Sequence, residues 1–226
     1  MECFLLHSAC TNRNFGVLTD FFLLSMNDVT SNVILQFLLS RRTWIFVFLL
    51  CVFSIMPVNA NNFIRWSPER RLIWGDFQGT VDPNRNPTTQ AIAKVVLEVK
   101  TSLEDNKIEF QVSSFFDKSG SWTVNHTSEH ILQHEQLHFD IAELYARKLR
   151  RTLSGMRGLT FRNLKARVDE AYRIIQQSHE AMQKRYDRET NHSNNIKVQE
   201  EWNRKIPTLL YDLKEYSDIT VFQNLQ

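Results

Sequence analysis

The sequence predicts an α+β fold, in which a small antiparallel or mixed sheet at the N-terminal side packs on a C-terminal helical part. Residues 61–123 hold short apolar runs that alternate with polar residues and are separated by turn-forming residues, as in strands and their connections. After residue 125, apolar residues recur every three to four positions, which indicates amphipathic helices. The chain therefore changes from strands to helices near its middle.

The β-rich part is expected to contain three strands. Residues 71–74 read as a short strand that runs into the turn Gly75-Asp76. Residues 92–99 are rich in Val and Leu, and residues 108–116 alternate more cleanly between apolar and polar. The polar stretch 104–107 between them has the composition of a hairpin connection, so these two strands should be neighbours.

The helical part is expected to contain three helices. The first should follow the capping residues Asn125, Thr127 and Ser128 and end before Gly155. The second should start after residues 158–160, and the short connection makes it an antiparallel neighbour of the first. The third runs from about residue 196 toward 216, with Pro207 as a candidate interruption.

Composition limits the classes of function. The formal net charge is +2, which gives no indication of a nucleic-acid partner. Cys3, Cys10 and Cys51 all lie in the first quarter of the chain, so no disulfide framework and no cysteine metal site can exist after residue 60. Any transition-metal ligands there must come from His, Asp and Glu.

Residues 41–60 have the order of a secretory signal peptide. Two arginines precede the apolar run 44–56, and the small-residue site 58–60 follows it. We therefore expect an N-terminal extension over residues 1–60 that ends in the signal peptide, and a single domain over 61–226. The protein would then be secreted or periplasmic. An uncleaved membrane anchor is the competing interpretation, and the apolar run argues against it because it is shorter than the ~20 residues of a membrane-spanning helix.

A charged region normally opens a signal peptide, and residues 1–40 fit poorly in front of one. We expect the true start to lie downstream, with Met26 as a candidate.

The central motif is His134-Glu135-Gln136-Leu137-His138. Four residues make a little over one helical turn, so both imidazoles point from one face of the helix and can bind one metal ion. Zinc bound there would lower the pKa of a water molecule from ~15.7 to about 7, and the adjacent Glu135 could take the proton as the general base. This is the chemistry of zinc peptidases.

Other polar residues on this helix and just before it have different expected roles. His126 and His130 extend the histidines to a ladder at four-residue steps, which could be a solvated face or a second metal site. We expect both residues to line the cleft entrance and contact substrate. Asp140 and Glu143 point away from the metal face, so surface or inter-helix positions are expected for both.

A catalytic zinc needs a third protein ligand and an open position for water. Antiparallel packing brings the end of the second helix back level with His134. From geometry alone, Asp187, Glu189 and His192 are equal candidates. His179 precedes the required level, and packing or solvent exposure is expected for it.

Several blocks of the chain resemble a bacterial family of predicted secreted zinc-dependent proteases, classified as a domain of unknown function. The blocks are Leu72-Ile73-Trp74-Gly75-Asp76-Phe77-Gln78-Gly79, Ser121-Trp122, the stretch 133–143 around the motif, Tyr186-Asp187, Glu189-Thr190-Asn191-His192, Gln199 and Trp202. They extend over about residues 70–206. The resemblance favours His192 as the third zinc ligand. Ser193 departs from it, because a glycine is expected there.

The resemblance and the motif together imply a zincin-like arrangement. By analogy with zincins, Tyr186 could donate a hydrogen bond to the tetrahedral intermediate, although a core position suits a tyrosine equally. An edge strand beside the metal helix could pair with an extended substrate, and the strand containing Phe110 to Phe116 is the candidate.

The sequence therefore predicts a secreted zinc metallopeptidase that acts on a peptide or protein substrate. Two alternatives remain. One is a zinc-stabilised envelope or binding domain without turnover, which would hold the metal with four protein ligands. The other is a hydrolase of a non-peptide cell-wall amide.

Overall fold

Two long strands form the centre of the fold. A computed structural model describes residues 4–5 and 62–226 of the chain. In it, β4 (Val95–Glu104) and β5 (Lys107–Asp117) pair antiparallel along their whole length, in a register that puts Val99 opposite Val112. Asp105 and Asn106 form the turn, both with positive φ, as a tight two-residue hairpin requires. The hairpin that the polar stretch predicted is confirmed.

Shorter strands complete an antiparallel sheet around this hairpin. The strand order is β1 (Phe4–Leu5), β4, β5 and β2 (Phe63–Arg65), and β7 (Thr220–Asn224) also pairs with β5. A second, two-stranded sheet joins β3 (Ala91–Ile92) to β6 (Trp122–Thr123). β4 pairs with one edge of β5, and β7 and β2 pair with successive parts of the other, so both edges of β5 are occupied.

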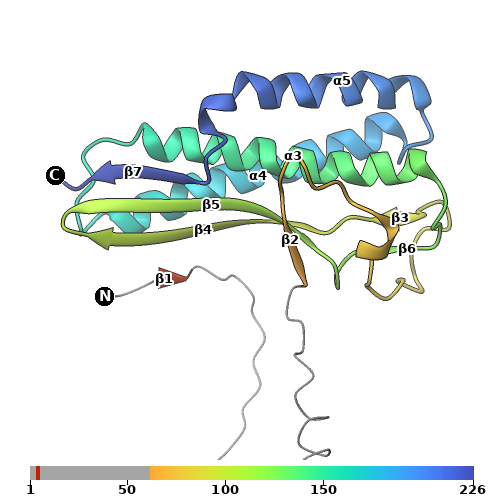
Figure 1. The fold of residues 1–226 in the computed structure, drawn as a ribbon, viewed down its shortest axis with the longest axis horizontal. Helices are drawn as coiled ribbons and strands as arrows, with labels where there is room; N and C mark the ends of the chain where they lie inside the picture. Colours follow the sequence, from red (N-terminus) through yellow and green to blue (C-terminus); the bar gives the residue numbers. More distant parts are fainter. Residues whose placement is uncertain (1–3, 6–61) are drawn as a thin grey trace, which may run out of the picture. The chain divides into compact units, whose positions relative to one another are not determined.

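Three helices follow, and α3 lies along the sheet (Figure 1). They are α3 (Glu129–Ser154), α4 (Leu164–Thr190) and α5 (Ile196–Asp212). Ser128 caps α3, since its hydroxyl accepts a hydrogen bond from the Ile131 N–H, and Gly155 follows its last turn. The expected α+β class, with its antiparallel sheet and helical part, is confirmed for the described residues.

The main core lies between the sheet and the helices. Alternate residues of β5 face it, among them Ile108, Phe110 and Val112, which are all fully buried. Helix α3 contributes a continuous stripe that includes Ile141 and Leu149, with α4 and α5 packed behind it. Burial of each such side chain stabilises the fold by about 1.5–3 kcal/mol, so this core fixes α3 against the sheet.

The predicted strand over residues 71–74 is wrong. The backbone of Ile73 is extended, but the segment leads into the short 3-10 helix η1 (Trp74–Asp76) and joins neither sheet formed by the described residues. Its N–H groups bond to side chains instead. The Leu72 N–H donates to Gln136 Oε1 on α3, and the Ile73 N–H donates to Asp76 Oδ2. The sequence pattern predicted an extended backbone, but it could not show which groups accept the backbone hydrogen bonds.

The C-terminal part differs from the expectation in two respects. Helix α5 continues through Pro207 without interruption. After η2 (Lys214–Tyr216), the chain ends in β7, a strand that the sequence pattern did not indicate.

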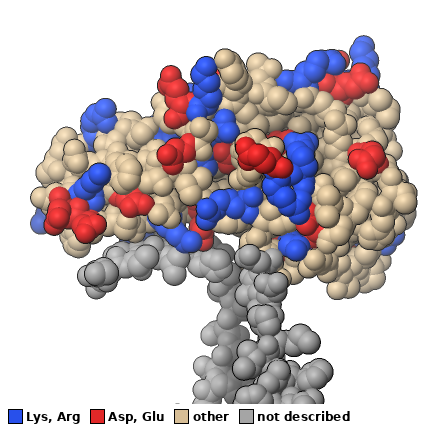
Figure 2. Space-filling model, viewed as in Figure 1, with Lys and Arg blue, Asp and Glu red and all other residues tan. Residues whose placement is uncertain are grey.

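Charged side chains of both signs are interspersed over the face shown in Figure 2. Among residues 4–5 and 62–226, no helix has the length and apolar character to cross a membrane. The predicted signal peptide, residues 41–60, and the candidate start Met26 lie outside the described residues.

Candidate metal centre

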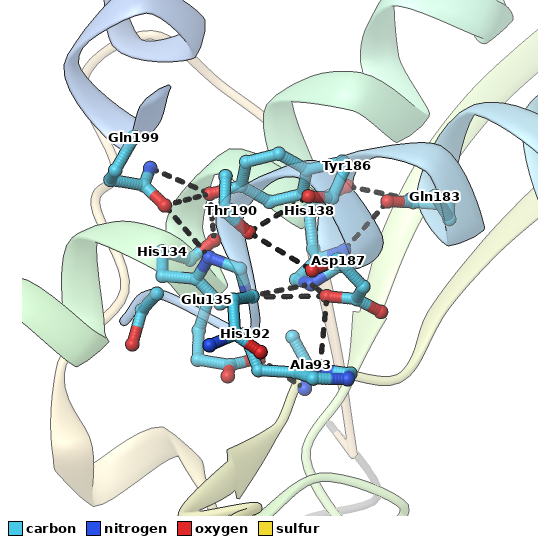
Figure 3. Close-up of polar contacts among 12 residues, drawn as sticks. Ala93, His134, Glu135, His138, Gln183, Tyr186, Asp187, Thr190, His192 and Gln199 are labelled. Carbon is cyan, nitrogen blue, oxygen red and sulfur yellow. Dashed lines mark hydrogen bonds and ion pairs between the residues drawn. The ribbon is translucent and has the colours of Figure 1, made fainter. Parts of the chain in front are cut away.

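Three ligand atoms converge where α4 crosses the first turns of α3 (Figure 3). His134 and His138 project from one face of α3, and Asp187 reaches them from the last turns of α4. Asp187 Oδ1 lies 3.2 Å from His134 Nε2 and 2.9 Å from His138 Nε2, and the two Nε2 atoms are 3.2 Å apart. These three atoms form a nearly equilateral triangle.

The tautomer of each histidine is set by a glutamine. Gln199 Oε1 lies 2.9 Å from His134 Nδ1, and Gln183 Oε1 lies 2.7 Å from His138 Nδ1. An amide oxygen can only accept, so each Nδ1 carries the hydrogen and each neutral ring presents its Nε2 lone pair to the triangle. Three acceptors that face one another within hydrogen-bond distance need a cation or a proton between them.

When no metal is bound, a proton on His138 can separate these acceptor atoms. Burial disfavours the charged imidazolium of His138, but the hydrogen bond and charge of Asp187 outweigh burial and raise the His138 pKa to about 9. Burial likewise disfavours the Asp187 carboxylate, but hydrogen bonds from both histidines hold its pKa well below the ordinary value. The site therefore favours positive charge at its centre.

A tetrahedral zinc ion fits this triangle. Zinc lies ~2.0–2.1 Å from its nitrogen and oxygen ligands, which puts ligand atoms about 3.3–3.4 Å apart. The observed separations of 2.9–3.2 Å are within a few tenths of an ångström of that spacing. His134, His138 and Asp187 are thus the residues that could hold the metal.

Glu135 lies beside the triangle, at the boundary between α3 and the sheet. Its carboxylate is buried and accepts a hydrogen bond of 2.7 Å from the Ala93 N–H. Burial raises the Glu135 pKa, although the neighbouring histidines oppose that shift. A carboxylate with raised affinity for protons suits a general base.

The other two candidates for the third ligand lie elsewhere. Glu189 binds Arg185 and the Trp202 indole N–H, away from the triangle. His192 lies in the turn after α4, with Nδ1 3.7 Å from Asp187 Oδ1, and it is not one of the three converging residues. Of the three candidates, the structure brings Asp187 into the group.

Tyr186 supports the ligands and does not face the groove. Its ring is fully buried and stacks on His134, with 4.6 Å between ring centroids and 24° between planes. Its hydroxyl donates to the His134 carbonyl oxygen and accepts from Gln199 Nε2. Burial raises the Tyr186 pKa. The expected contact between this hydroxyl and the reaction intermediate does not fit this position, because the hydroxyl is turned toward α5.

The outer histidines of the ladder do not line the groove. The ring of His126 lies against Trp74, and His130 Nε2 bonds to the Ser193 carbonyl oxygen at 2.6 Å. The expectation that they line the cleft entrance is wrong, because neither histidine borders the groove over the converging ligand atoms. His179 is buried against Tyr145, which is the first of the two positions expected for it, packing rather than solvent exposure.

Asp140 and Glu143 are buried rather than on the surface. Asp140 accepts hydrogen bonds from the Trp66 indole and from Gln136, which ties α3 to the segment before η1. Glu143 accepts from Arg147, Arg150 and the hydroxyl of Ser114 in β5. Both are structural anchors of α3.

A groove of about 430 Å³ opens over the triangle. Its floor includes Glu135 and His138, one wall is the extended segment 89–95, and the other wall is α4. The rim near Asp187 is completed by His192. A ligand of several residues could therefore reach the converging atoms.

Three residues that support the ligands are not predicted from the sequence. Gln183 precedes Asp187 by four residues and so lies on the same face of α4. Gln199 belongs to the resemblance, which gives it no role. Ala93 acts through its backbone N–H, which leaves no signal in the sequence.

Residues 60–193 match a family described as bacterial protein of unknown function (DUF922). The chain belongs to this family. The matched segment includes the three converging residues, Glu135 and the turn that carries His192, and it ends at Ser193. No curated protein and no solved structure gives a significant match to the chain. The family description names no activity, so function must be argued from the site.

Proposed function

We propose that this member of the family is an exported zinc-dependent peptidase with a zincin-like arrangement of its site. The observation that carries the proposal is the triangle of acceptor atoms from His134, His138 and Asp187, whose sides match tetrahedral zinc. Export rests on the signal-peptide pattern of residues 41–60.

Two imidazoles and a carboxylate are a ligand set that zinc hydrolases use. Among the described residues, the cluster offers three ligand side chains. A tetrahedral ion keeps its fourth position for water in such a site, whereas a structural zinc site usually has four protein ligands. The ligand count and the buried carboxylate of Glu135 therefore favour an enzyme over a zinc-stabilised binding domain.

Glu135 supplies the proton transfers. Zinc at the triangle would lower the pKa of a bound water molecule from ~15.7 to about 7. As the water oxygen bonds to the peptide carbonyl carbon, Glu135 receives the water proton. The C–N bond then breaks, and Glu135 delivers that proton to the departing nitrogen. The products are a carboxylic acid and an amine, so no other reactant is required.

The wall of the groove favours an extended peptide as substrate. The carbonyl oxygens of Gln90 and Lys94 accept hydrogen bonds from Val124 and Asp117, inside the sheets. Backbone groups alternate in direction along a strand, so those of Ala91 and Ala93 face the opposite side, where the Ala93 N–H meets Glu135. A peptide could add to this edge as a further strand.

This edge replaces the one expected from the sequence. The strand containing Phe110 to Phe116 is β5, and both of its edges are paired with other strands. It therefore has no free edge for a substrate. Peptide pairing along 91–95 also favours a peptide over the alternative of a cell-wall amide, which lacks a regular extended backbone.

Metal analysis and proteolysis of the purified protein test the proposal. Wild type should bind one zinc ion and cleave unfolded casein, and EDTA should stop the cleavage. Glu135→Gln should keep the zinc but lower kcat by about 10²–10⁴-fold, because the base is lost. His138→Ala should lose the zinc.

Glu129→Gln is the matched control, because Glu129 lies on the same helix but is exposed and outside the groove. It should retain both zinc and activity. Full activity in Glu135→Gln would remove Glu135 as the base. Failure of the wild-type protein to bind zinc would overturn the metal site itself.

A further inference from the structure

The turn after α4 has an uncommon backbone. Asn191, His192 and Ser193 all have positive φ, of 50°, 50° and 71°. This left-handed region is uncommon for residues other than glycine, and one such residue at the end of a helix is ordinary, whereas three in succession are not. Residues held in such a backbone conformation cluster at active sites and ligand-binding sites.

Hydrogen bonds from several directions hold this turn. The His192 N–H donates to the Asp187 carbonyl oxygen, and the Asn195 N–H donates to that of Thr190. From α3, the ring of His130 bonds to the Ser193 carbonyl oxygen at 2.6 Å. The turn is therefore fixed both to α4 and to the helix that carries the motif. This contact gives His130, one turn before His134, a structural role.

The fixed turn places the His192 ring at the rim of the groove. Its Nδ1 is 3.7 Å from Asp187 Oδ1, and its side chain is 51% exposed. Within residues 62–226, no closer polar contact of this ring is found, so Nε2 on the other side of the ring has no partner. His192 and Glu135 line the same groove. The ring is thus carried by a fixed backbone at the rim, and its Nε2 is free.

We propose that His192 donates a hydrogen bond to the carbonyl oxygen of the peptide bond under attack. This inference rests on the proposed function. That oxygen gains negative charge as water adds to the carbonyl carbon, and a donor fixed in advance stabilises the charge without reorganising. The Tyr186 hydroxyl is buried and bonded elsewhere, so His192 takes the role that analogy gave to the tyrosine.

Lys184 is the other exposed donor on this side of the groove. Its flexible four-carbon chain has no contact that fixes it, since no ion pair of Lys184 is found among the described residues. His192 has a shorter side chain on a turn whose backbone is held by hydrogen bonds, and this favours His192 as the donor.

The test compares His192→Ala and His192→Gln with wild type, with His126→Ala as a control histidine outside the groove. Three properties are measured. They are zinc content, kcat and KM on a fluorogenic peptide copied from a wild-type cleavage site in casein, and the affinity of a phosphinic peptide of the same sequence. The phosphinic group mimics the tetrahedral, negatively charged geometry.

His192→Ala should keep one zinc ion, change KM by less than about threefold and lower kcat by about 10²–10³-fold. The phosphinic peptide should bind at least about tenfold more weakly. His192→Gln, whose amide can still donate, should regain at least about tenfold in kcat. The His126→Ala control should match wild type in all three measurements.

Loss of zinc from His192→Ala would make His192 a ligand and overturn the inference. Unchanged kcat with zinc retained would overturn it too, while the proposed function stands. A wild-type protein that binds zinc but cleaves no peptide would refute the proposed function, and the role of His192 with it.

Discussion

At the level of single residues, the two histidines depend on partners that lie outside their motif. The side chains of Gln183 and Gln199 each accept a hydrogen bond from the Nδ1–H of one histidine ring. Both rings therefore present Nε2 to Asp187. Gln183 also donates to the His138 carbonyl oxygen and to His179 Nε2, which fixes the orientation of its amide. The orientation of the ligands is therefore decided by amides on α4 and α5.

Gln183→Leu and Gln199→Leu should each weaken zinc binding by about 10–100-fold, because the partner that orients the ring is lost. Competition with a zinc chelator of known affinity measures this. Gln177→Leu is the control, since Gln177 is exposed on α4 and, within residues 62–226, bonds only to Arg173. Equal zinc affinity in all three variants would show that the glutamines do not orient the ligands.

His179 makes the stability of the fold depend on pH. Burial lowers its pKa to about 4, and the charge of His138 adds to this, whereas Glu180 opposes it. In the unfolded chain the value is about 6.5, so between pH 6.5 and 4 the unfolded state binds more protons. Folding stability should therefore fall as the pH drops through this window, by up to about 3 kcal/mol.

Urea unfolding of wild type and His179→Gln in EDTA, at pH 7 and pH 4.5, measures this effect. The variant should lose less stability between the two pH values than wild type does. An equal loss in both proteins would show that His179 is not the group responsible.

At the level of elements, helix α3 uses one face for the candidate metal site and the opposite face to pack against the sheet. One face carries the histidines, and the other is tied to the sheet by Arg150, which is only 1% exposed. Arg150 donates to the Val112 carbonyl oxygen in β5, to the Tyr216 carbonyl oxygen and to Glu143. The same helix thus connects the site to the C-terminal segment, and its position depends on a buried ion pair.

Arg150→Met should lower the free energy of unfolding by about 3–5 kcal/mol, because a buried ion pair loses one partner and carbonyl oxygens lose their donor. Chemical denaturation provides the value. Arg173→Ala breaks the exposed pair with Glu170, and it should change stability by no more than about 1 kcal/mol. Similar losses in the two variants would contradict the role assigned to the buried pair.

At the level of the whole molecule, the site joins elements that are distant in sequence. Asp187 on α4 supplies the third ligand atom beside the two histidines of α3, and Gln199 on α5 contacts the ring of His134. A metal ion bound there would connect two helices whose packing also forms the core. Metal binding should therefore be coupled to the stability of the fold.

Removal of zinc should lower the melting temperature. At a free zinc concentration of 100 times Kd, binding to the folded state alone adds about 2.7 kcal/mol, or roughly 5–11 °C for a domain of this size. Thermal melts with zinc and with EDTA measure the shift. His138→Ala should show no difference between the two conditions. A zinc-dependent shift in that variant would point to binding elsewhere.

The hairpin, the three helices and a cap among Asn125, Thr127 and Ser128 could be predicted from the sequence because each depends on neighbours within a few residues. The strand β7 and the 3-10 helix η1 could not, since their backbone partners are chosen by packing against β5 and Gln136. The same distinction holds for the site. Chain order could bring the end of α4 near His134, but it could not rank Asp187 against His192, five residues away.

The sequence by itself determined that His134 and His138 share one helical face, because the period of an α-helix is a local property. Only the tertiary structure decided that Asp187 is the third converging residue, that Gln183 and Gln199 set the ring tautomers, and that the edge at Ala93 borders the groove. These depend on the rotation and axial position of α4 and α5 against α3. Such offsets are fixed by the fit of side chains across the core, and a shift of one residue would rotate a different side chain toward the metal.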